Sequence, residues 1–138
     1  MKKEEIKAKN APRAIGPYSQ AVRFGNLIFV SGQIGVDPDN NMLVEGIRNQ
    51  TNQALTNLKN VLKAGDSDMN NIIKTTVYLA DMDDFSVMNE IYTTYFPKPY
   101  PARATVQVAR LPKDALVEID CIAYINADCC QQDSCCIC

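Results

Sequence analysis

Apolar residues recur at a helical period in two segments of the chain. The first covers residues 47–64 and is followed by Gly65, a residue favoured just past the end of a helix. The second covers residues 85–96 and ends directly before Pro97. Because proline cannot continue a helix, we expect the second helix to stop there. The pattern therefore predicts two amphipathic helices, each with one apolar face for a core.

Runs of β-branched and aromatic residues indicate strands between these helices and before them. Residues 21–24 and 27–30 flank Gly25-Asn26, a two-residue hairpin signal, although Gly-Asn is less favoured there than Asn-Gly. Residues 72–79 form another such run after the first helix. These segments predict a hairpin followed, beyond the first helix, by a third strand.

Two more β-rich runs, residues 101–110 and 115–125, flank the turn-like residues 111–114. We interpret them as a hairpin with a four-residue loop. Strand alternation places one set of side chains on a core face: Val106, Val108, Val117, Ile119, Cys121, Ala123 and Ile125. It places a polar set on the other face: Arg103, Thr105, Gln107, Glu118 and Asp120.

The polar face of this hairpin has two interpretations. If Ala115 lies opposite Arg110, Gln107 lies opposite Glu118, so the two strands agree on which face is polar. Such a face could simply be solvated, or it could carry a site. The predicted order β-β-α-β-α-β-β gives an α+β fold in which two helices cover one face of the sheet. The polar face is then open in a monomer, and Tyr92 and Tyr95 in the second helix are assigned to the core.

Composition narrows the possible chemistry. The chain has 138 residues, enough for one domain, and a net charge of −2 without the basic excess typical of nucleic-acid binding. It contains no histidine, which excludes Ser-His-Asp and Cys-His catalysis and His-ligated metal sites. No apolar run approaches the ~20 residues of a membrane span, and the N-terminal residues lack a signal core. We expect a cytoplasmic protein with no membrane association.

Four separated motifs resemble those of the RidA family, also called the YjgF or L-PSP endoribonuclease family. They are Gly16-Pro17-Tyr18-Ser19-Gln20-Ala21, Val30-Ser31-Gly32-Gln33, Asp81-Met82-Asp83-Asp84-Phe85 with Met88-Asn89, and the run from Pro101 to Ile119. The resemblance runs from about residue 14 to residue 125 and implies a chorismate-mutase-like fold. It also implies a homotrimer in which the open sheet faces meet around a central axis, with active sites between subunits.

The resemblance implies an enamine/imine deaminase that hydrolyses 2-imino acids, formed from 2-aminoacrylate or 2-aminocrotonate, to 2-keto acids and ammonia. No metal or organic cofactor and no nucleic-acid partner are implied. Two alternatives stay open: an endoribonuclease or translation inhibitor, which is the family's older label, and a non-catalytic small-molecule-binding trimer. The ribonuclease alternative lacks a basic patch, stacking aromatic residues and a histidine pair in this sequence.

Arg103 and Glu118 are the residues best suited to such chemistry. A guanidinium binds a carboxylate with two parallel hydrogen bonds. The resemblance implies that Arg103 binds the substrate carboxylate in this way. The alternative is a structural ion pair with Asp120 or Glu118. Partial burial would raise the pKa of Glu118 toward that of a general base. The resemblance implies that Glu118 holds or activates the attacking water. The alternative is a cross-strand contact with Gln107. In the predicted hairpin the two lie about 13 Å apart, so we expect them to meet across a subunit boundary.

Five further residues match family positions that line the ligand pocket: Tyr18, Ser31, Gly32, Asn89 and Thr105. Tyr18 is assigned to catalysis with Arg103 and Glu118, and the other four to substrate binding. Each has a plainer interpretation, as a packed turn, a strand end or a helix-surface hydrogen bond. Thr105 departs from the many bacterial members that have cysteine there, so no cysteine-based reaction is expected at this site.

The chain ends in a cysteine-rich segment. Five of the six cysteines lie in the final ten residues, whereas Cys121 falls on the predicted core face. We expect one domain over residues 1–127 and a flexible tail over residues 128–138. The tail has three open interpretations: an oxidisable thiol-rich appendage, a soft-metal site, or a lipidated terminus resembling Cys-x-Cys endings.

Overall fold

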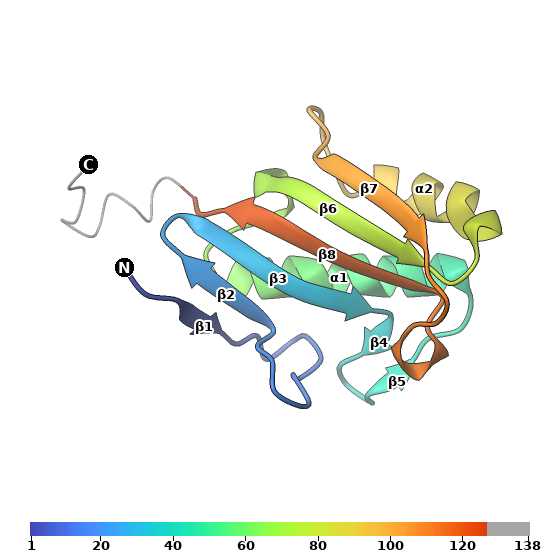
Figure 1. The fold of residues 1–138 in the computed structure, drawn as a ribbon, viewed down its shortest axis with the longest axis horizontal. Helices are drawn as coiled ribbons and strands as arrows, with labels where there is room; N and C mark the ends of the chain where they lie inside the picture. The colour runs from blue at the N-terminus through green and yellow to red at the C-terminus, as the bar shows by residue number, and fades with distance from the viewer. Residues whose placement is uncertain (127–138) are drawn as a thin grey trace.

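The fold is a single layer of β-sheet covered on one side by two helices (Figure 1). The computed structural model describes residues 1–126, so the cysteine-rich tail and the proposed boundary at residue 127 lie outside the described residues. The strands are β1 (Glu4–Ile6), β2 (Ala21–Phe24), β3 (Leu27–Ile34), β4 (Val36–Asp37), β5 (Met42–Leu43), β6 (Ile72–Leu79), β7 (Ala102–Gln107) and β8 (Val117–Tyr124). The helices are α1 (Ile47–Ala64) and α2 (Phe85–Thr93).

Helix α1 forms where the hydrophobic pattern predicts it. Its inward stripe, which includes Leu55, Leu58 and Leu62, is completely buried against the sheet. Gly65 ends the helix: its N–H donates to the Leu62 carbonyl at 3.0 Å, and the next N–H, of Asp66, donates to the Lys63 carbonyl at 3.2 Å. A side chain at this position would meet the Ile6 Cδ1 atom at 2.7 Å, so glycine also allows β1 to approach the helix end.

Helix α2 is shorter than its apolar stripe predicts. It ends at Thr93, before Pro97, and Thr94 is its C-cap. Both threonines turn their hydroxyls onto helix carbonyls: Thr93 Oγ1 donates to the Asn89 carbonyl at 2.8 Å and Thr94 Oγ1 to that of Ile91 at 2.7 Å. Such bonds and the branched side chains disfavour helix continuation, which accounts for the earlier end.

The predicted hairpin between the last two strands is wrong. The six-stranded sheet has the order β1-β2-β3-β8-β6-β7, so β8 lies between β3 and β6, and β7 is an edge strand parallel to β6. Parallel pairing arises because β6, α2 and β7 form a crossover unit whose helix packs on the sheet. Residues 111–114, predicted as a hairpin loop, instead form a 3-10 turn in the connection that passes from the edge strand to the sheet centre. The predicted β2–β3 hairpin and the strand at 72–79 are confirmed.

This topology separates side chains that the sequence pattern placed together. Arg103 pairs with Thr75 and therefore faces the helices, whereas Glu118 pairs with Tyr78 and faces the open side of the sheet. The prediction that Arg103 and Thr105 share a face with Glu118 is therefore wrong. Val106, predicted in the core, is 42% exposed on the open side because the edge strand is turned over relative to the predicted register.

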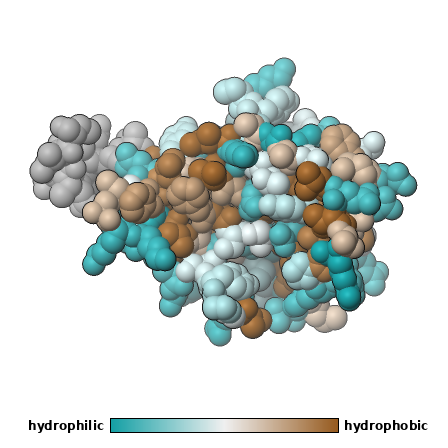
Figure 2. All heavy atoms as spheres, viewed as in Figure 1, coloured by the Kyte–Doolittle hydropathy of each residue, from teal (hydrophilic) through white to brown (hydrophobic). Residues whose placement is uncertain are grey.

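The open face is more apolar than predicted. Its exposed apolar side chains gather over β2, β3 and the end of β8: Phe24, Leu27, Phe29 and Tyr124. Figure 2, viewed from this side, shows brown atoms grouped over these strands, with polar side chains beside them. A group of exposed apolar side chains is more typical of an interaction surface than of a solvated face. Within residues 1–126, no helix is long and apolar enough to cross a membrane.

Candidate active site

Arg103 is held between strand β7 and helix α2. Its guanidinium carbon lies 4.7 Å from the centre of the Tyr92 ring and 5.5 Å from that of the Phe85 ring. Its Nη1 atom donates a hydrogen bond of 2.8 Å to Asn89 Oδ1. The two rings and the amide fix the plane of the guanidinium, since an arginine over aromatic faces gains both stacking and cation–π attraction.

The aromatic support beneath Arg103 is itself fixed. The Tyr92 hydroxyl lies 2.7 Å from the Thr75 hydroxyl in a buried contact, and its ring centre is 4.4 Å from that of Phe96. Tyr92 is buried, as its assignment to the core predicted, but the same ring also contacts the candidate ligand-binding group. Burial raises the pKa of the Tyr92 phenol, so it stays a neutral hydrogen-bonding group.

No acidic side chain among the described residues forms an ion pair with Arg103. The structural ion pair with Asp120 or Glu118, weighed from the sequence, is therefore not formed within the chain. A cleft of ≈ 400 Å³ opens beside the guanidinium, lined by Asn89, Tyr92, Thr93, Tyr100, Pro101 and Arg103. A positioned guanidinium with free donors facing a cleft is suited to a carboxylate ligand.

Glu118 lies on the open face in the middle of the sheet. Burial, and secondarily the charge of Asp120, raises the pKa of the Glu118 carboxyl. The carboxyl lies against the backbone of Gly32: a Cβ atom there would be 2.6 Å from Glu118 Cδ and 2.6 Å from Oε2. The β3–β8 register shifts between Val30 and Gln33, and this irregularity brings Gly32 under the carboxyl.

Ser31 connects Gly32 to the loop that carries Tyr18. Its hydroxyl donates to the Ser19 carbonyl at 2.6 Å, and its N–H donates to the Gln20 carbonyl at 2.9 Å. Tyr18 is 53% exposed, and its hydroxyl accepts a long bond of 3.4 Å from the Ile15 N–H. This exposed ring is available to a ligand or a partner surface rather than packed in a turn.

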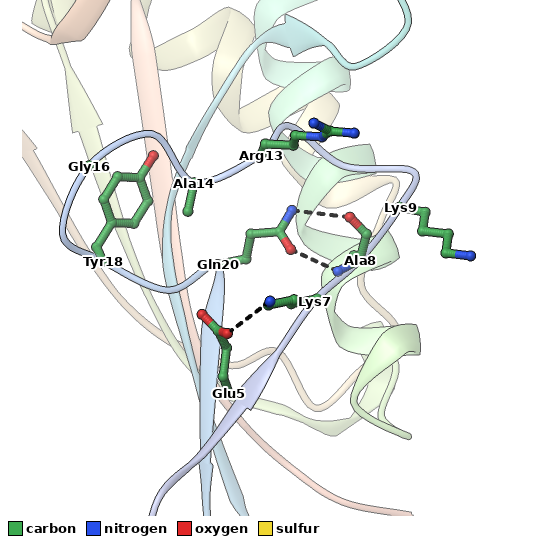
Figure 3. A pocket seen from close by; sticks show the side chains of 9 residues that line it. All are labelled: Glu5, Lys7, Ala8, Lys9, Arg13, Ala14, Gly16, Tyr18 and Gln20. Atoms are coloured by element: carbon green, nitrogen blue, oxygen red, sulfur yellow. Dashed lines mark hydrogen bonds and ion pairs between the residues drawn. The ribbon is translucent and has the colours of Figure 1, made fainter.

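A wide hollow of ≈ 780 Å³ lies beside the Tyr18 loop (Figure 3). Gln20 holds its floor together, because its side chain accepts from the Ala8 N–H at 2.7 Å and donates to the Pro12 carbonyl at 2.7 Å. Figure 3 shows Lys9 and Arg13 pointing away from the Tyr18 ring, and Lys7 reaches Glu5 at 3.5 Å. The basic side chains therefore do not converge on a common ligand position.

The seven residues expected in the site fall into two groups. The arginine half-site contains Arg103 and Asn89, with Thr105 on the same side of β7. The glutamate half-site contains Glu118 and Gly32, with Ser31 and Tyr18 on the adjoining strand and loop. Strand β6 separates the two groups, which also lie on opposite sides of the sheet. One chain therefore does not bring Arg103 and Glu118 together.

Replacing Gly32 by alanine should displace the Glu118 carboxyl without unfolding the protein. The new Cβ would occupy space now filled by the end of a flexible side chain, which can rotate away. We expect little change in thermal unfolding and roughly a tenfold or larger loss of turnover in the reaction proposed below. Gly46→Ala is the space-matched control, because a Cβ at Gly46 meets nothing within 4 Å, although its φ of 83° makes some loss of stability expected. Native turnover in Gly32→Ala would contradict the placement of Glu118.

Over residues 1–126, no three histidine, cysteine or acidic side chains come together as a ligand set. Cys121 is a buried core residue, as predicted, and burial raises the pKa of its thiol. The chemistry available to the two half-sites is carboxylate binding by Arg103 and proton transfer by Glu118.

Comparison with known proteins gives one consistent result. The family model described as Endoribonuclease L-PSP matches residues 8–125. A mouse 2-iminobutanoate/2-iminopropanoate deaminase is 54% identical over 119 residues, covering 86% of this chain and 88% of the relative. A RutC family protein of Pyrococcus horikoshii is 53% identical over 123 residues, covering 88% of this chain and 98% of the relative.

Solved structures agree with the sequence comparison. E. coli TdcF with bound serine has a TM-score of 0.85 at 39% identity, covering 89% of this chain and 99% of that one. RidA from an Antarctic Psychrobacter has a TM-score of 0.86 at 45% identity, covering 88% and 99%. The family match spans most of the chain and includes all seven candidate residues. This protein therefore belongs to the RidA (YjgF, L-PSP endoribonuclease) family.

Proposed function

We propose that this protein is an enamine/imine deaminase that hydrolyses small 2-imino acids to 2-keto acids and ammonia. The observation that carries the proposal is the guanidinium of Arg103, which is fixed by two rings and Asn89 and has no acidic partner in the described chain. The names of relatives about half identical to this chain, such as the mouse deaminase, support the same reaction.

Each half-site has a separate task in this reaction. Arg103 binds the substrate carboxylate through paired N–H donors, with Asn89 and Thr105 beside it. Glu118 accepts a proton from water as the oxygen attacks the imine carbon and passes it to the imine nitrogen, giving a carbinolamine. It then accepts the hydroxyl proton of the carbinolamine and passes it to the same nitrogen, as the C–N bond breaks and the C=O bond forms. One imine and one water become one keto acid and one ammonia. Ser31, Gly32 and Tyr18 line the side where the water is held.

A homotrimer would complete the site, and it forms part of the proposal. Arg103 of one subunit and Glu118 of its neighbour would meet at an interface that covers the apolar open face. A cytoplasmic location also belongs to the proposal and can be checked by cell fractionation.

Light scattering in reducing buffer is expected to give about three chain masses at micromolar concentration. Phe29→Lys should weaken assembly, because it places a charge on the open face where Phe29 is 44% exposed. Asn40→Lys, in the exposed β4–β5 turn, is the matched control. A stable monomer of the native chain would contradict a site shared between subunits.

A coupled assay tests the reaction directly. A pyridoxal-phosphate dehydratase acting on serine or threonine releases the enamine, and addition of this protein should accelerate ammonia release above the spontaneous rate. The older ribonuclease label is tested in parallel by incubating the same preparation with single-stranded RNA. Unchanged ammonia release, with or without RNA cleavage, would refute the deaminase.

A further inference from the structure

A tyrosine and a second carboxylate lie beside Glu118 on the open face. Tyr78 is directly opposite Glu118 in the β6–β8 register, and its hydroxyl donates a hydrogen bond of 3.1 Å to Asp120 Oδ2. Asp120 follows Glu118 by two residues on β8, so the two acids share a face about 7 Å apart along the strand. The backbone of Tyr78 therefore lies opposite Glu118, while its hydroxyl reaches Asp120.

No nearby cation neutralises this pair in the described chain. Strand β3 presents Gly32 and Ile34 to Glu118, and β7 presents Val106 opposite Tyr78. Lys74 is the basic residue of β6 on this face, but it lies opposite Ile122, farther along β8, and is exposed. Neither Glu118 nor Asp120 forms an ion pair with any described residue. Within one subunit the two carboxyls therefore act on each other without an ion-pairing partner, and Arg103 of the neighbouring subunit is the cation that the proposed trimer would bring to them.

Hydrolysis of an imine sets a specific requirement for the proton carrier. The group must take a proton from the attacking water and then hold it long enough to give it to the departing nitrogen. A carboxyl with an ordinary pKa would lose that proton to solvent near neutral pH. Burial raises the pKa of Glu118, and the charge of Asp120 adds to the effect.

Tyr78 is suited to hold the Asp120 carboxyl in place. Burial first, and then its hydrogen bond to Asp120, raise the pKa of the Tyr78 phenol. The phenol therefore keeps its proton and donates a hydrogen bond to the Asp120 carboxyl. This hydrogen bond fixes the position of the Asp120 carboxyl on the same face as Glu118.

We propose that Tyr78 and Asp120 are positioning residues for the hydrolysis: Tyr78 holds the Asp120 carboxylate beside Glu118, so that Glu118 can carry a proton from water to departing ammonia. This inference rests on the deaminase proposed above. It assigns a role to two residues that need not touch the substrate.

The experiment compares Asp120→Asn, Tyr78→Phe and a charge-matched control, Asp39→Asn, in an exposed turn. The carboxyl carbon of Glu118 is followed by NMR titration of the full-length protein, and the pH profile of imine hydrolysis is measured beside it. In Asp120→Asn, Glu118 should titrate at lower pH, because the neighbouring charge is gone. On the acid limb of the profile this variant should then be roughly two- to tenfold faster than the native protein. Tyr78→Phe should shift the same way by less, and Asp39→Asn not at all.

The two measurements separate this inference from the proposed function. An unchanged Glu118 titration in Asp120→Asn overturns the inference even if imine hydrolysis is real. A shifted titration with an unshifted acid limb also overturns it, because Glu118 is then not the proton carrier. If the protein does not hydrolyse imines, the deaminase falls with the role assigned here, while the titration still reports the Asp120 effect. Should Asp120→Asn fail to assemble, Tyr78→Phe, which loses one hydroxyl, carries the same test.

Discussion

Arg103→Ala is expected to lower kcat/KM for imine hydrolysis by roughly 30- to 1000-fold, the loss of a charge-assisted bidentate contact of ~2–4 kcal/mol. The fold should persist, because Arg103 is only partly buried and forms no ion pair within the described chain. Pyruvate and 2-oxobutyrate are keto-acid products that carry the carboxylate Arg103 would bind. In calorimetry they should bind the native protein and fail to bind this variant.

Arg103→Lys sharpens the same test. An ammonium keeps the charge but cannot form two parallel hydrogen bonds, and it loses the stacking on Phe85 and Tyr92. We therefore expect poor rescue of both turnover and keto-acid binding. Arg48→Ala is the matched control, since Arg48 is an exposed arginine whose contact is an ion pair of 3.3 Å with Glu90. Native rates in both Arg103 variants would remove Arg103 from the mechanism.

Glu118→Gln is the second change with a large expected effect. It keeps the size of the side chain but removes the proton acceptor, so kcat should fall by about 10²- to 10⁴-fold. Keto-acid binding should be largely retained, because Arg103 belongs to the other half-site. Turnover and calorimetry on one preparation therefore distinguish the roles of the two residues. Equal losses of binding and turnover would argue against the division of tasks.

The pH dependence of stability gives an independent check on Glu118→Gln. In the native protein the pKa of the Glu118 carboxyl is raised, so the folded protein binds the Glu118 proton more tightly than the unfolded chain does. The contribution of Glu118 to stability is therefore present at low pH and is lost as pH rises through the folded pKa. At neutral pH the glutamine variant should not have a lower free energy of unfolding than the native protein. Lost activity would then reflect chemistry rather than unfolding.

Local elements and the β2–β3 hairpin were predictable from the sequence, whereas the pairing of strands far apart in the chain was not. Helix α1 and strand β6 begin and end as the hydrophobic pattern predicts. The helical period and the run of strand-forming residues are both local signals, carried by neighbouring residues in the sequence. The turn-like residues 111–114 suggested a hairpin, but β8 pairs with β3 and β6 instead. This pairing depends on the β6-α2-β7 crossover, which buries the apolar stripe of α2 against the sheet. Such a non-local effect cannot be seen in the alternation of apolar and polar residues within two strands.

The same limit applies to the candidate site. The motifs identified Arg103 and Glu118. Their predicted separation within a hairpin indicated an inter-subunit site; the hairpin is wrong, and the inter-subunit site stays a prediction. The rings under Arg103 were missed, because Phe85 and Tyr92 belong to the stripe that periodicity assigns to the core. The approach of Gly32 to Glu118 depends on a register shift in β3 that no local signal marks.

Subunit complementation tests most directly whether one site uses Arg103 of one chain and Glu118 of another. Arg103→Ala and Glu118→Gln chains, each nearly inactive, are unfolded together at equal amounts and refolded. In randomly mixed trimers, about one quarter of the interfaces should pair an intact Arg103 with an intact Glu118 across the boundary. The mixture should therefore regain about one quarter of native imine hydrolysis, while either variant refolded alone regains none. Activity no greater than the sum of the two variants, in trimers shown to be mixed, would contradict a shared site.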